Sequence, residues 1–539
     1  MPTLDPENIS VMGLSLYQQL CNLARMALGA GDFRDTAHPH TRAMDHLWKI
    51  ALRANSTDVS MGAIQYLNSY YMGQQLQQED DFVAKCMFHL SSAAERLISK
   101  KEEGESSHGS MPCEEKEEKV VDKQNIYEHM TEEAALQCIQ RALLLLKTHL
   151  DTFKRRYAYH LRRWALAETG AWEGALGPGT VRLTLQPAGA GPRACLTLHH
   201  SDLVAHLRAH VHVWWEKQIQ GEEGVTSLST DGPLRMITQG QELTIDYDER
   251  TLYDMGFKDN QLVFVSVGVG GRGAWAEWPS AQPAPARARL PTLLLLDPTY
   301  FHHLFTLMQA LGQMKEPGAN GEPVAHTKAQ LLSRRVWDIL QAVPLNPTLL
   351  EAFQNPIESK LPELLDPTSP QKLMYSLHII DKLSSSNSGP NVKEPAGNSE
   401  KNEEEKSAAE NWNDLFIKKG GLRILYDIMM SGVLQRSDDS EWRQDCLALL
   451  LQMLCRIGTL PSPDPSQTPK LHPSLLSLMT VEETTERLIS ILCEAATLKE
   501  PTTYKTGFWG RAQVVQHAMR MCVWWARGGG DAVSLAWSL

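Results

Sequence analysis

Residues 180–268 constrain the fold of this 539-residue chain more than any other stretch. Two short runs with alternating apolar residues, VRLTLQ and ACLTLHH, are separated by a Pro/Gly turn and predict a hairpin. The following SDLVAHLRAHVHVWWEKQ has a polar start at Ser201 and Asp202, which can cap a helix. Its apolar residues recur at helical spacing, at Leu203, Leu207, Val211 and Trp214. The stretch therefore opens with strand, strand and helix.

The second half of this stretch returns to strands. LRMIT at 234–238 is followed by a Gly turn with ELTI, an Asp-rich connection, and QLVFVSVG at 261–268, which is rich in β-branched and aromatic residues. This order suits a β-grasp sheet, in which a helix crosses a hairpin and the last strand returns to the middle. The layout is similar to the ubiquitin fold, so we expect Leu252 to fill the core and Gly256 to relieve backbone strain. A fold alone does not establish a function.

Charge and cysteine usage exclude several classes of protein. The net charge of -12 and the pI near 5.9 argue against a dedicated nucleic-acid binder, which needs a basic surface. No apolar run approaches the roughly 18 to 20 residues that cross a bilayer, and the N-terminus has no signal-peptide pattern. Nine scattered cysteines without a CxxC pair indicate a reducing compartment. We expect a protein of the cytoplasm, the nucleus or both, with protein partners and no membrane or nucleic-acid partner.

Amphipathic helices with short loops fill most of the rest of the chain. Their density predicts a mainly α fold of armadillo- or HEAT-like helical repeats, into which the β-grasp domain is inserted. Two charged or polar stretches with few large apolar residues predict disorder. The predicted segments are helical repeats at 1–100, an acidic disordered insert at 101–123, helical repeats at 124–170, the β-grasp domain at 180–268, a Gly/Pro/Ala linker at 269–291, helical repeats at 292–383, a disordered linker at 384–410 and helical repeats at 411–539.

The sequence predicts no catalytic, cofactor-binding or metal-binding residue. Cys21, Cys138 and Cys455 lie mid-helix and Cys113 lies in the acidic insert, each without a basic partner. His206 and His210 lie four residues apart, but no further ligand pattern accompanies them, so an exposed helix face is the plainer interpretation. The glycines of GVGGRG lead into a Pro-rich linker and not into a helix N-terminus, as a phosphate loop would.

One basic and aromatic cluster, KRRYAYHLRRW at 154–164, leaves two interpretations open. It could contact an acidic partner or RNA, or it could form a solvated Arg-rich helix face. In SRRVWDIL at 333–340, we expect Val336, Ile339 and Leu340 to lie in the core.

Several long motifs point to one family. AIQYLNSYY, LLLLKTHLDTFKRRYAYHLRRW, GPLRMITQGQELTIDYDERTLYDMGFKDNQLVFVSVG, LSRRVWDILQAVP and GGLRILYDIMMSG resemble the region upstream of the catalytic domain in the very large ubiquitin-specific proteases. The resemblance implies a parent enzyme that is a cysteine isopeptidase removing ubiquitin, with a helical-repeat body and an internal ubiquitin-like domain. The Cys box and the Gly-His-Tyr box of that family are missing from this chain, so no catalytic residue carries over.

We therefore expect a noncatalytic scaffold or regulatory region that binds protein partners through helical repeats and the ubiquitin-like domain. The best candidates for a docking surface are residues that we expect on exposed strands, Arg235, Ile237 and Val263. Two alternatives stay open at this point: a stand-alone helical-repeat adaptor unrelated to ubiquitin chemistry, and a hydrolase with an unrecognised reactive thiol.

Overall fold

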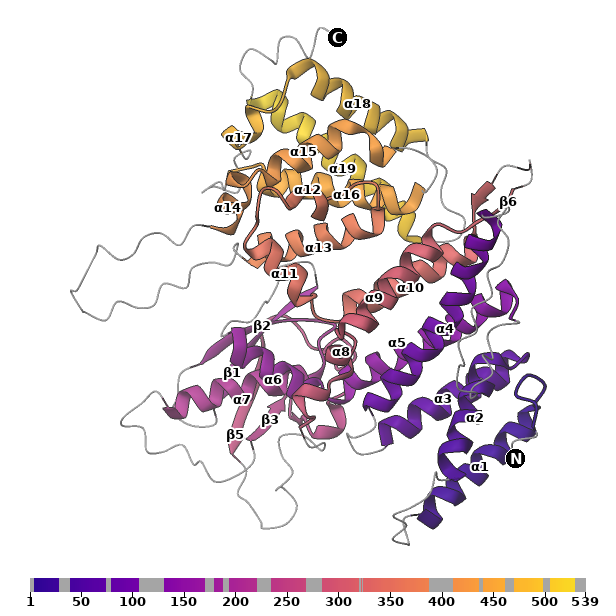
Figure 1. Cartoon of the computed structure of the whole chain (residues 1–539). Helices are drawn as coiled ribbons and strands as arrows, with labels where there is room; N and C mark the ends of the chain where they lie inside the picture. The colour runs from indigo at the N-terminus through magenta and orange to yellow at the C-terminus, as the bar shows by residue number, and fades with distance from the viewer. Residues whose placement is uncertain are drawn as a thin grey trace. The chain divides into compact units, whose positions relative to one another are not determined.

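The computed structural model is mainly helical, with one five-stranded mixed sheet and a two-stranded hairpin (Figure 1). The structure describes residues 4–28, 39–73, 79–105, 130–169, 179–187, 193–220, 234–267, 284–318, 321, 323–386, 411–435, 440–460, 470–497 and 505–528. The chain divides into two compact units. Unit 1 comprises Met1–Leu90 and Gln137–Leu295, and unit 2 comprises Ser91–Leu136 and Leu296–Leu539.

Six helices come first along the chain. They are α1 (Val11–Leu28), α2 (Pro39–Arg53), α3 (Thr57–Gly73), α4 (Glu79–Glu105), α5 (Glu132–Arg156) and α6 (Ala158–Thr169). Within unit 1, α4 and α5 meet around a buried polar pair, in which His149 Nε2 lies 2.6 Å from Glu79 Oε2. The His149 ring stacks on Phe82 with a centroid distance of 3.8 Å. The first turn of α4 is thus held against the middle of α5.

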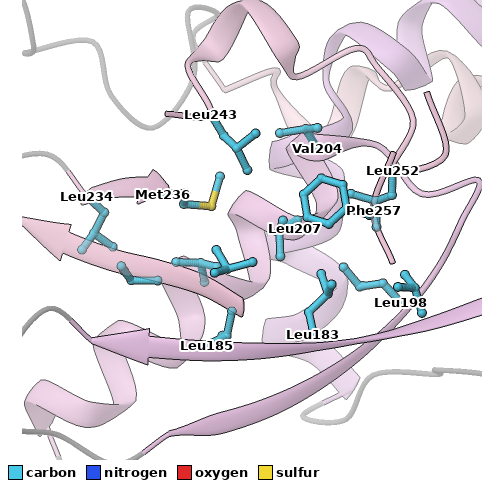
Figure 2. Close-up of a cluster of buried hydrophobic side chains, with 14 of the residues drawn as sticks. Leu183, Leu185, Leu198, Val204, Leu207, Leu234, Met236, Leu243, Leu252 and Phe257 are labelled. Carbon is cyan, nitrogen blue, oxygen red and sulfur yellow. The ribbon is translucent and has the colours of Figure 1, made fainter. Parts of the chain in front are cut away.

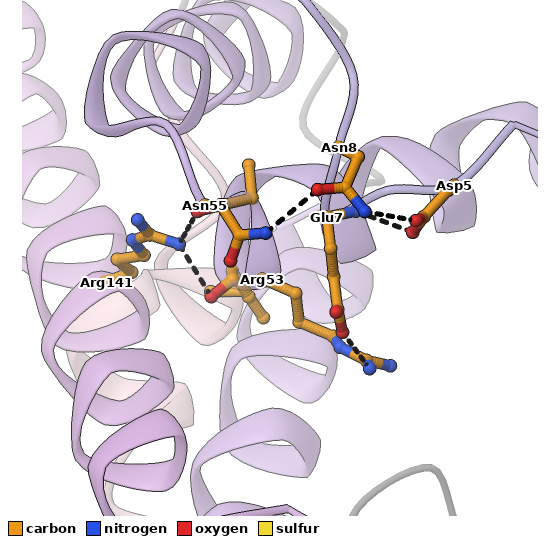
Figure 3. Close-up of polar contacts among 8 residues, drawn as sticks. Asp5, Glu7, Asn8, Arg53, Asn55 and Arg141 are labelled. Carbon is orange, nitrogen blue, oxygen red and sulfur yellow. Dashed lines mark hydrogen bonds and ion pairs between the residues drawn. The ribbon is translucent and has the colours of Figure 1, made fainter.

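The C-terminal end of α2 is capped by a buried arginine from α5 (Figure 3). Arg141 donates hydrogen bonds of 3.1 Å to the Leu52 carbonyl and 2.7 Å to the Ala54 carbonyl. The last carbonyls of a helix have no partner within the helix, so a cation there satisfies them and opposes the helix dipole. Nearby, Arg53 pairs with Glu7, so the segment before α1 contacts the C-terminal end of α2.

The sheet belongs to unit 1, and its residues follow α6 in the chain. Its elements are β1 (Thr180–Pro187), β2 (Ala194–His199), α7 (Val204–Gln220), β3 (Leu234–Thr238), β4 (Gln241–Glu242) and β5 (Gln261–Val267). The strand order is β2-β1-β5-β3-β4, and only the β1–β5 pair is parallel. The last strand therefore runs in the middle of the sheet, as the sequence predicted.

Helix α7 buries one face of this sheet (Figure 2). Val204, Leu207 and Val211 of the helix belong to one cluster with alternate residues of the strands, such as Leu183 and Met236. Of the apolar stripe expected on the helix, Leu207 and Val211 are in this cluster, whereas Leu203 packs against α6. The helix also starts at Val204, so neither Ser201 nor Asp202 is its cap residue.

The connection from β4 to β5 wraps the start of α7. Leu252 is buried in the core and Gly256 has a φ of +71°, so both residues have the roles that the sequence predicted. Of the expected ELTI strand, only Glu242 lies in β4, because the chain soon turns into a short 3-10 helix, Ile245–Tyr247. Arg208, which is almost fully buried, donates to the carbonyls of Leu243 and Thr244 and pairs with Asp248 at 2.8 Å.

The segment that follows the sheet in unit 1 contains a 3-10 turn, Arg287–Arg289, and α8 (Pro291–Leu294). Unit 2 contains, in chain order, α9 (Pro298–Gly312), β6 (Lys315–Pro317), β7 (Pro323–Ala325), α10 (Thr327–Ala342), α11 (Pro347–Gln354), α12 (Leu361–Leu364), α13 (Pro370–Ser386), α14 (Trp412–Lys418), α15 (Gly421–Ser431), the 3-10 turn Val433–Gln435, α16 (Ser440–Ile457), α17 (Pro473–Leu476), α18 (Val481–Thr497) and α19 (Lys505–Gly528). The β6–β7 hairpin was not predicted.

The core of unit 2 contains the residues expected from SRRVWDIL: Val336, Ile339 and Leu340 are buried. Beside them, the Arg334 guanidinium lies 4.0 Å from the centroid of the Trp442 ring and pairs with Asp445 at 2.5 Å. A partly desolvated cation–π contact and an ion pair thus join α10 to α16.

Gly420 lies between α14 and α15, and Gly421 is the first residue of α15. Gly420 has a φ of +82°, and a Cβ on Gly421 would lie 2.3 Å from Cζ of Phe416. The first glycine supplies a left-handed turn, and the second lets the Phe416 ring pack against the backbone.

The predicted disordered and linker segments are only partly described. Helix α4 continues through Glu105 and α13 through Ser386, so the boundaries expected at 101 and 384 are wrong. Lys and Glu favour helix, which fits the extension of α4 through the charged residues 101–105; the extension of α13 consists of three serines. Most of the two segments and the GVGGRG stretch lie outside the described residues. The expected linker at 269–291 is described from 284, where it includes the turn Arg287–Arg289 and the first residue of α8.

Candidate functional site: the outer face of the sheet

The five-stranded sheet has two chemically different faces. On the inner face, toward α7, the side chains of Val181, Leu183 and Leu185 in β1 are buried. Because successive side chains of a strand point to opposite sides, the residues between them point away from α7. We call this second side the outer face; its members are Arg182, Thr184 and Gln186 of β1, Cys195, Thr197 and His199 of β2, Leu262, Phe264 and Ser266 of β5, Arg235 and Ile237 of β3, and Glu242 of β4.

Two of the three predicted docking residues lie on the outer face. Arg235 and Ile237 are half-buried residues of β3, separated by the buried Met236. Val263 does not lie there: it is fully buried in the inner-face core with Val265, so that prediction is wrong. In the parallel register with β1, Val263 is opposite Leu185, another inner-face residue.

The apolar centre of the outer face comes from β5 and β3. Phe264 is 44% exposed and lies opposite Ile237 in the β3–β5 register. Leu262, two residues earlier in β5, is half-buried and lies opposite Thr184 of β1. These three side chains, Ile237, Leu262 and Phe264, form what we call the apolar strip. Leu262 and Phe264 were missed as site residues, because β5 is apolar at both even and odd positions and its alternation does not show which of them face outward.

Two ion pairs flank the apolar strip. The Arg235 Nε donates to Glu242 Oε1 at 2.8 Å, and this hydrogen bond lowers the pKa of the Glu242 carboxyl. At the other end of β5, Arg182 Nη2 lies 2.6 Å from Asp259 Oδ2, and the Arg182 backbone N–H donates to the same carboxylate at 2.9 Å. These hydrogen bonds lower the pKa of Asp259 to about 2. Each of these four charges has a partner, so the strip is bordered by neutralised pairs.

The second half of the basic cluster at 154–164 joins α6 to α7 and to the turn before it. Arg162 Nη2 lies 3.0 Å from Asp202 Oδ1, and Tyr159 is buried with its hydroxyl 3.0 Å from His212 Nδ1. Arg163 pairs with Glu216 of α7. Tyr159 and Arg162 therefore form neither a solvated helix face nor a free basic patch. Their partners are His212 of α7 and Asp202, just before α7.

The histidines of α7 lie in different environments. His206 Nδ1 accepts a hydrogen bond from the Leu203 N–H at 3.1 Å. His210 is buried, so the exposed helix face expected for it is wrong; burial lowers its pKa to about 3. Burial also lowers the pKa of His212 to about 3. Within the parts of the chain that the structure describes, no cluster of three or more His, Cys, Asp or Glu side chains could hold a metal ion.

Several thiols are held protonated by burial. Burial raises the pKa of Cys21 and Cys86, and that of Cys455 to about 12. A nucleophilic cysteine needs the opposite shift, since the thiolate is the reactive form. Cys195 and Cys493 are exposed, and Cys113 lies outside the described residues. Among the described helices, none is both long and apolar enough to cross a membrane.

Comparison with known proteins relates the chain to ubiquitin carboxyl-terminal hydrolases. It is 37% identical over 707 aligned residues to ubiquitin carboxyl-terminal hydrolase puf of Drosophila melanogaster, covering 100% of this chain and 17% of that protein. It is 36% identical over 514 residues to ubiquitin carboxyl-terminal hydrolase 34 of Homo sapiens, covering 86% of this chain and 14% of that protein. The Mus musculus protein of that name is also 36% identical, over 86% of this chain.

No family model matches the chain, and no solved structure matches it. The chain spans less than a fifth of the length of the curated relatives that it matches. Their match nevertheless extends through the helical units and the sheet alike, because it covers most or all of this sequence. The chain is a homologue of one segment of the very large ubiquitin carboxyl-terminal hydrolases, the relatives of hydrolase 34 and puf.

Proposed function

We propose that this chain is a noncatalytic docking and regulatory segment of a large deubiquitinating enzyme, with the sheet and α7 acting as a ubiquitin-like β-grasp module. The strand order β2-β1-β5-β3-β4 with one crossing helix supports the β-grasp assignment. The helical blocks would act as armadillo- or HEAT-like scaffolds for protein partners in the cytoplasm or nucleus. The relatives' names supply the link to ubiquitin removal.

One observation carries the docking role: no described residue covers the apolar strip, whereas the other face of the sheet packs against α7. Phe264 exposes 44% of its surface at the middle of the sheet, between strands that bury their alternate residues completely. Interface centres are typically apolar or aromatic and bordered by polar groups, as this strip is by Arg235–Glu242 and Arg182–Asp259. A flat sheet face of this kind fits a folded protein partner of the ubiquitin system.

The test uses the catalytic domain of human ubiquitin carboxyl-terminal hydrolase 34 as the partner. The purified full chain, added in trans, is expected to bind this domain and to change its rate of cleavage of a fluorogenic ubiquitin substrate. Ile237→Asp and Phe264→Asp should each weaken the effect at least tenfold, because a charge on the strip must be desolvated on docking. Tyr253→Asp is the matched control, since Tyr253 is 75% exposed and outside the strip.

Unchanged cleavage and no binding at saturating chain would contradict the regulatory proposal. Equal weakening by all three variants would contradict the assignment to the strip. A second measurement addresses the noncatalytic role: a ubiquitin probe with a cysteine-reactive warhead should leave the chain unlabelled, and labelling would overturn that role.

A further inference from the structure

The two edges of the five-stranded sheet are protected to different degrees. One edge strand, β4, has only two residues, and its Glu242 is paired with Arg235. The other, β2, pairs over all six residues with β1 in unbroken register, so it has no bulge. Its sequence ACLTLH contains no proline and no Asp, Glu, Lys or Arg. Short length, charge, proline and bulges are the devices that protect sheet edges, and β2 has none of them.

The hydrogen-bond pattern identifies which backbone groups of β2 face outward. The His200 N–H donates to the Gly179 carbonyl across the β1–β2 pair at 2.8 Å, so this pair is of the hydrogen-bonded kind. Because the two kinds alternate along an antiparallel ladder, Cys195, Thr197 and His199 belong to non-hydrogen-bonded pairs. Their N–H and C=O groups therefore point away from β1. The same alternation holds across β1, where the Arg182 carbonyl accepts from Asn260 N–H on the β5 side.

The outward groups of His199 already have partners. Its N–H donates to Asp202 Oδ2 at 2.9 Å, and its carbonyl accepts from the Asp202 N–H at 2.9 Å. For Cys195 and Thr197, no described residue supplies a partner on that side. Two N–H donors and two C=O acceptors thus form an open ladder that ends at the Asp202 turn.

The core is incomplete at the same edge. Ala194 and Leu196 point to the inner face with the core cluster, yet both are only partly buried. The inner-face residues of the interior strands, such as Leu183, Val263 and Met236, are 0% exposed. A further strand beside β2 would cover Ala194 and Leu196 in the way that β1 and β5 cover each other's residues. A further strand beside β2 would therefore gain both backbone hydrogen bonds and apolar burial.

We propose that the free edge of β2 binds an extended segment of a partner protein, which adds a sixth strand to the sheet. The segment has about five residues, with apolar side chains at alternate positions to cover Ala194 and Leu196. Main-chain hydrogen bonds at Cys195 and Thr197 give the affinity, and the alternate apolar side chains give the specificity. This site is the edge of the sheet and is independent of the docking proposed for its outer face.

The probe is a capped, fluorescein-labelled TVRLTLQ peptide, the sequence of β1, which already pairs with β2 in the fold. Its anisotropy should rise on titration with the reduced full chain, and the amides of 194–199 should exchange more slowly with deuterium. Two further peptides carry N-methyl groups at alternate residues. In one peptide the methylated amides face one edge of the extended strand, and in the other they face the opposite edge. One of them should bind like the parent and the other should lose at least tenfold in affinity, the effect of losing about two hydrogen bonds.

Two variants of the chain complete the test. Thr197→Pro removes an outward N–H without breaking the β1 ladder, because proline is tolerated at that side of an edge strand, and should weaken binding at least tenfold. Thr197→Val keeps the N–H and should bind like the parent chain; thermal unfolding checks that both variants fold.

Three results would overturn the proposal. They are absence of binding by the parent peptide, equal binding of the two methylated peptides, and equal binding of Thr197→Pro and Thr197→Val. Dimerisation of the chain in sedimentation that Thr197→Pro abolishes would assign the edge to a second copy instead, and would overturn the partner segment.

Discussion

Ile237 and Phe264 lie directly opposite each other on β3 and β5, on the side of the sheet that α7 leaves uncovered. Their sequence neighbours Met236 and Val265 are likewise opposite each other, but they are buried beneath α7. One register thus places an apolar pair on each face of the same two strands. The inner pair stabilises the fold, and the outer pair belongs to the surface that we propose for docking.

The two faces predict different responses to truncation. Met236→Ala should lower the free energy of unfolding of the sheet region by about 2–5 kcal/mol, because it leaves a cavity in a fully buried site. Ile237→Ala, one residue along the same strand, should cost less than about 1 kcal/mol. Hydrogen exchange of peptides covering β3 and β5 measures both. Equal losses would show that the outer face is packed in solution.

Removing Arg208 should strongly lower the free energy of unfolding, because Arg208 belongs to a buried ion pair. Arg208→Ala leaves Asp248 and the carbonyls of Leu243 and Thr244 without their donor, and burial already raises the pKa of Asp248. Removing one partner of a buried pair costs about 3–5 kcal/mol, so exchange in the connection at 243–252 should accelerate. Arg235→Ala is the matched control, because its exposed pair with Glu242 contributes about 1 kcal/mol at most. Similar effects of both substitutions would contradict this account.

Partly buried histidines should cause a loss of stability in acid. Burial lowers the pKa of His89 to about 4, against about 6.5 in an unfolded chain. Between these values the unfolded state binds more protons, so the stability that neutral His89 contributes is complete above pH 6.5 and declines as the pH falls toward 4. Urea unfolding of unit 1 at pH 7.5, 6, 5 and 4 measures the decline. His89→Gln should flatten it, although His210 and His212 keep part of the slope; an unchanged slope would refute the role of His89.

Gly420 and Gly421, at the junction of α14 and α15, should differ in how well they tolerate substitution. Gly421→Ala should destabilise unit 2 by about 1–3 kcal/mol, because the new methyl group overlaps the Phe416 ring. Gly420→Asn should cost less, since asparagine tolerates the left-handed backbone and a Cβ there meets open space. Thermal unfolding of the two variants compares them. The reverse order would show that backbone conformation outweighs packing at this junction.

Strand and helix order could be predicted from the sequence because both depend on local patterns. Alternating residues, a polar helix start and the turn glycines sufficed for the order of elements, for the buried Leu252 and for the left-handed Gly256. The left-handed turn at Gly420 is likewise a local feature, since positive φ is a requirement of a single residue. These features need no knowledge of distant residues.

The face of each strand residue was decided only by the tertiary structure. QLVFVSV has apolar side chains at both even and odd positions, so alternation alone cannot tell Val263 from Phe264. Pairing with β1 and β3 and the position of α7 place Val263 inside and Phe264 outside. Arg162 likewise gained its partner Asp202 from forty residues away. The sequence by itself determined which elements form, because propensity and periodicity act locally; strand register and helix packing, which act between distant segments, determined which side chains remain exposed for a partner.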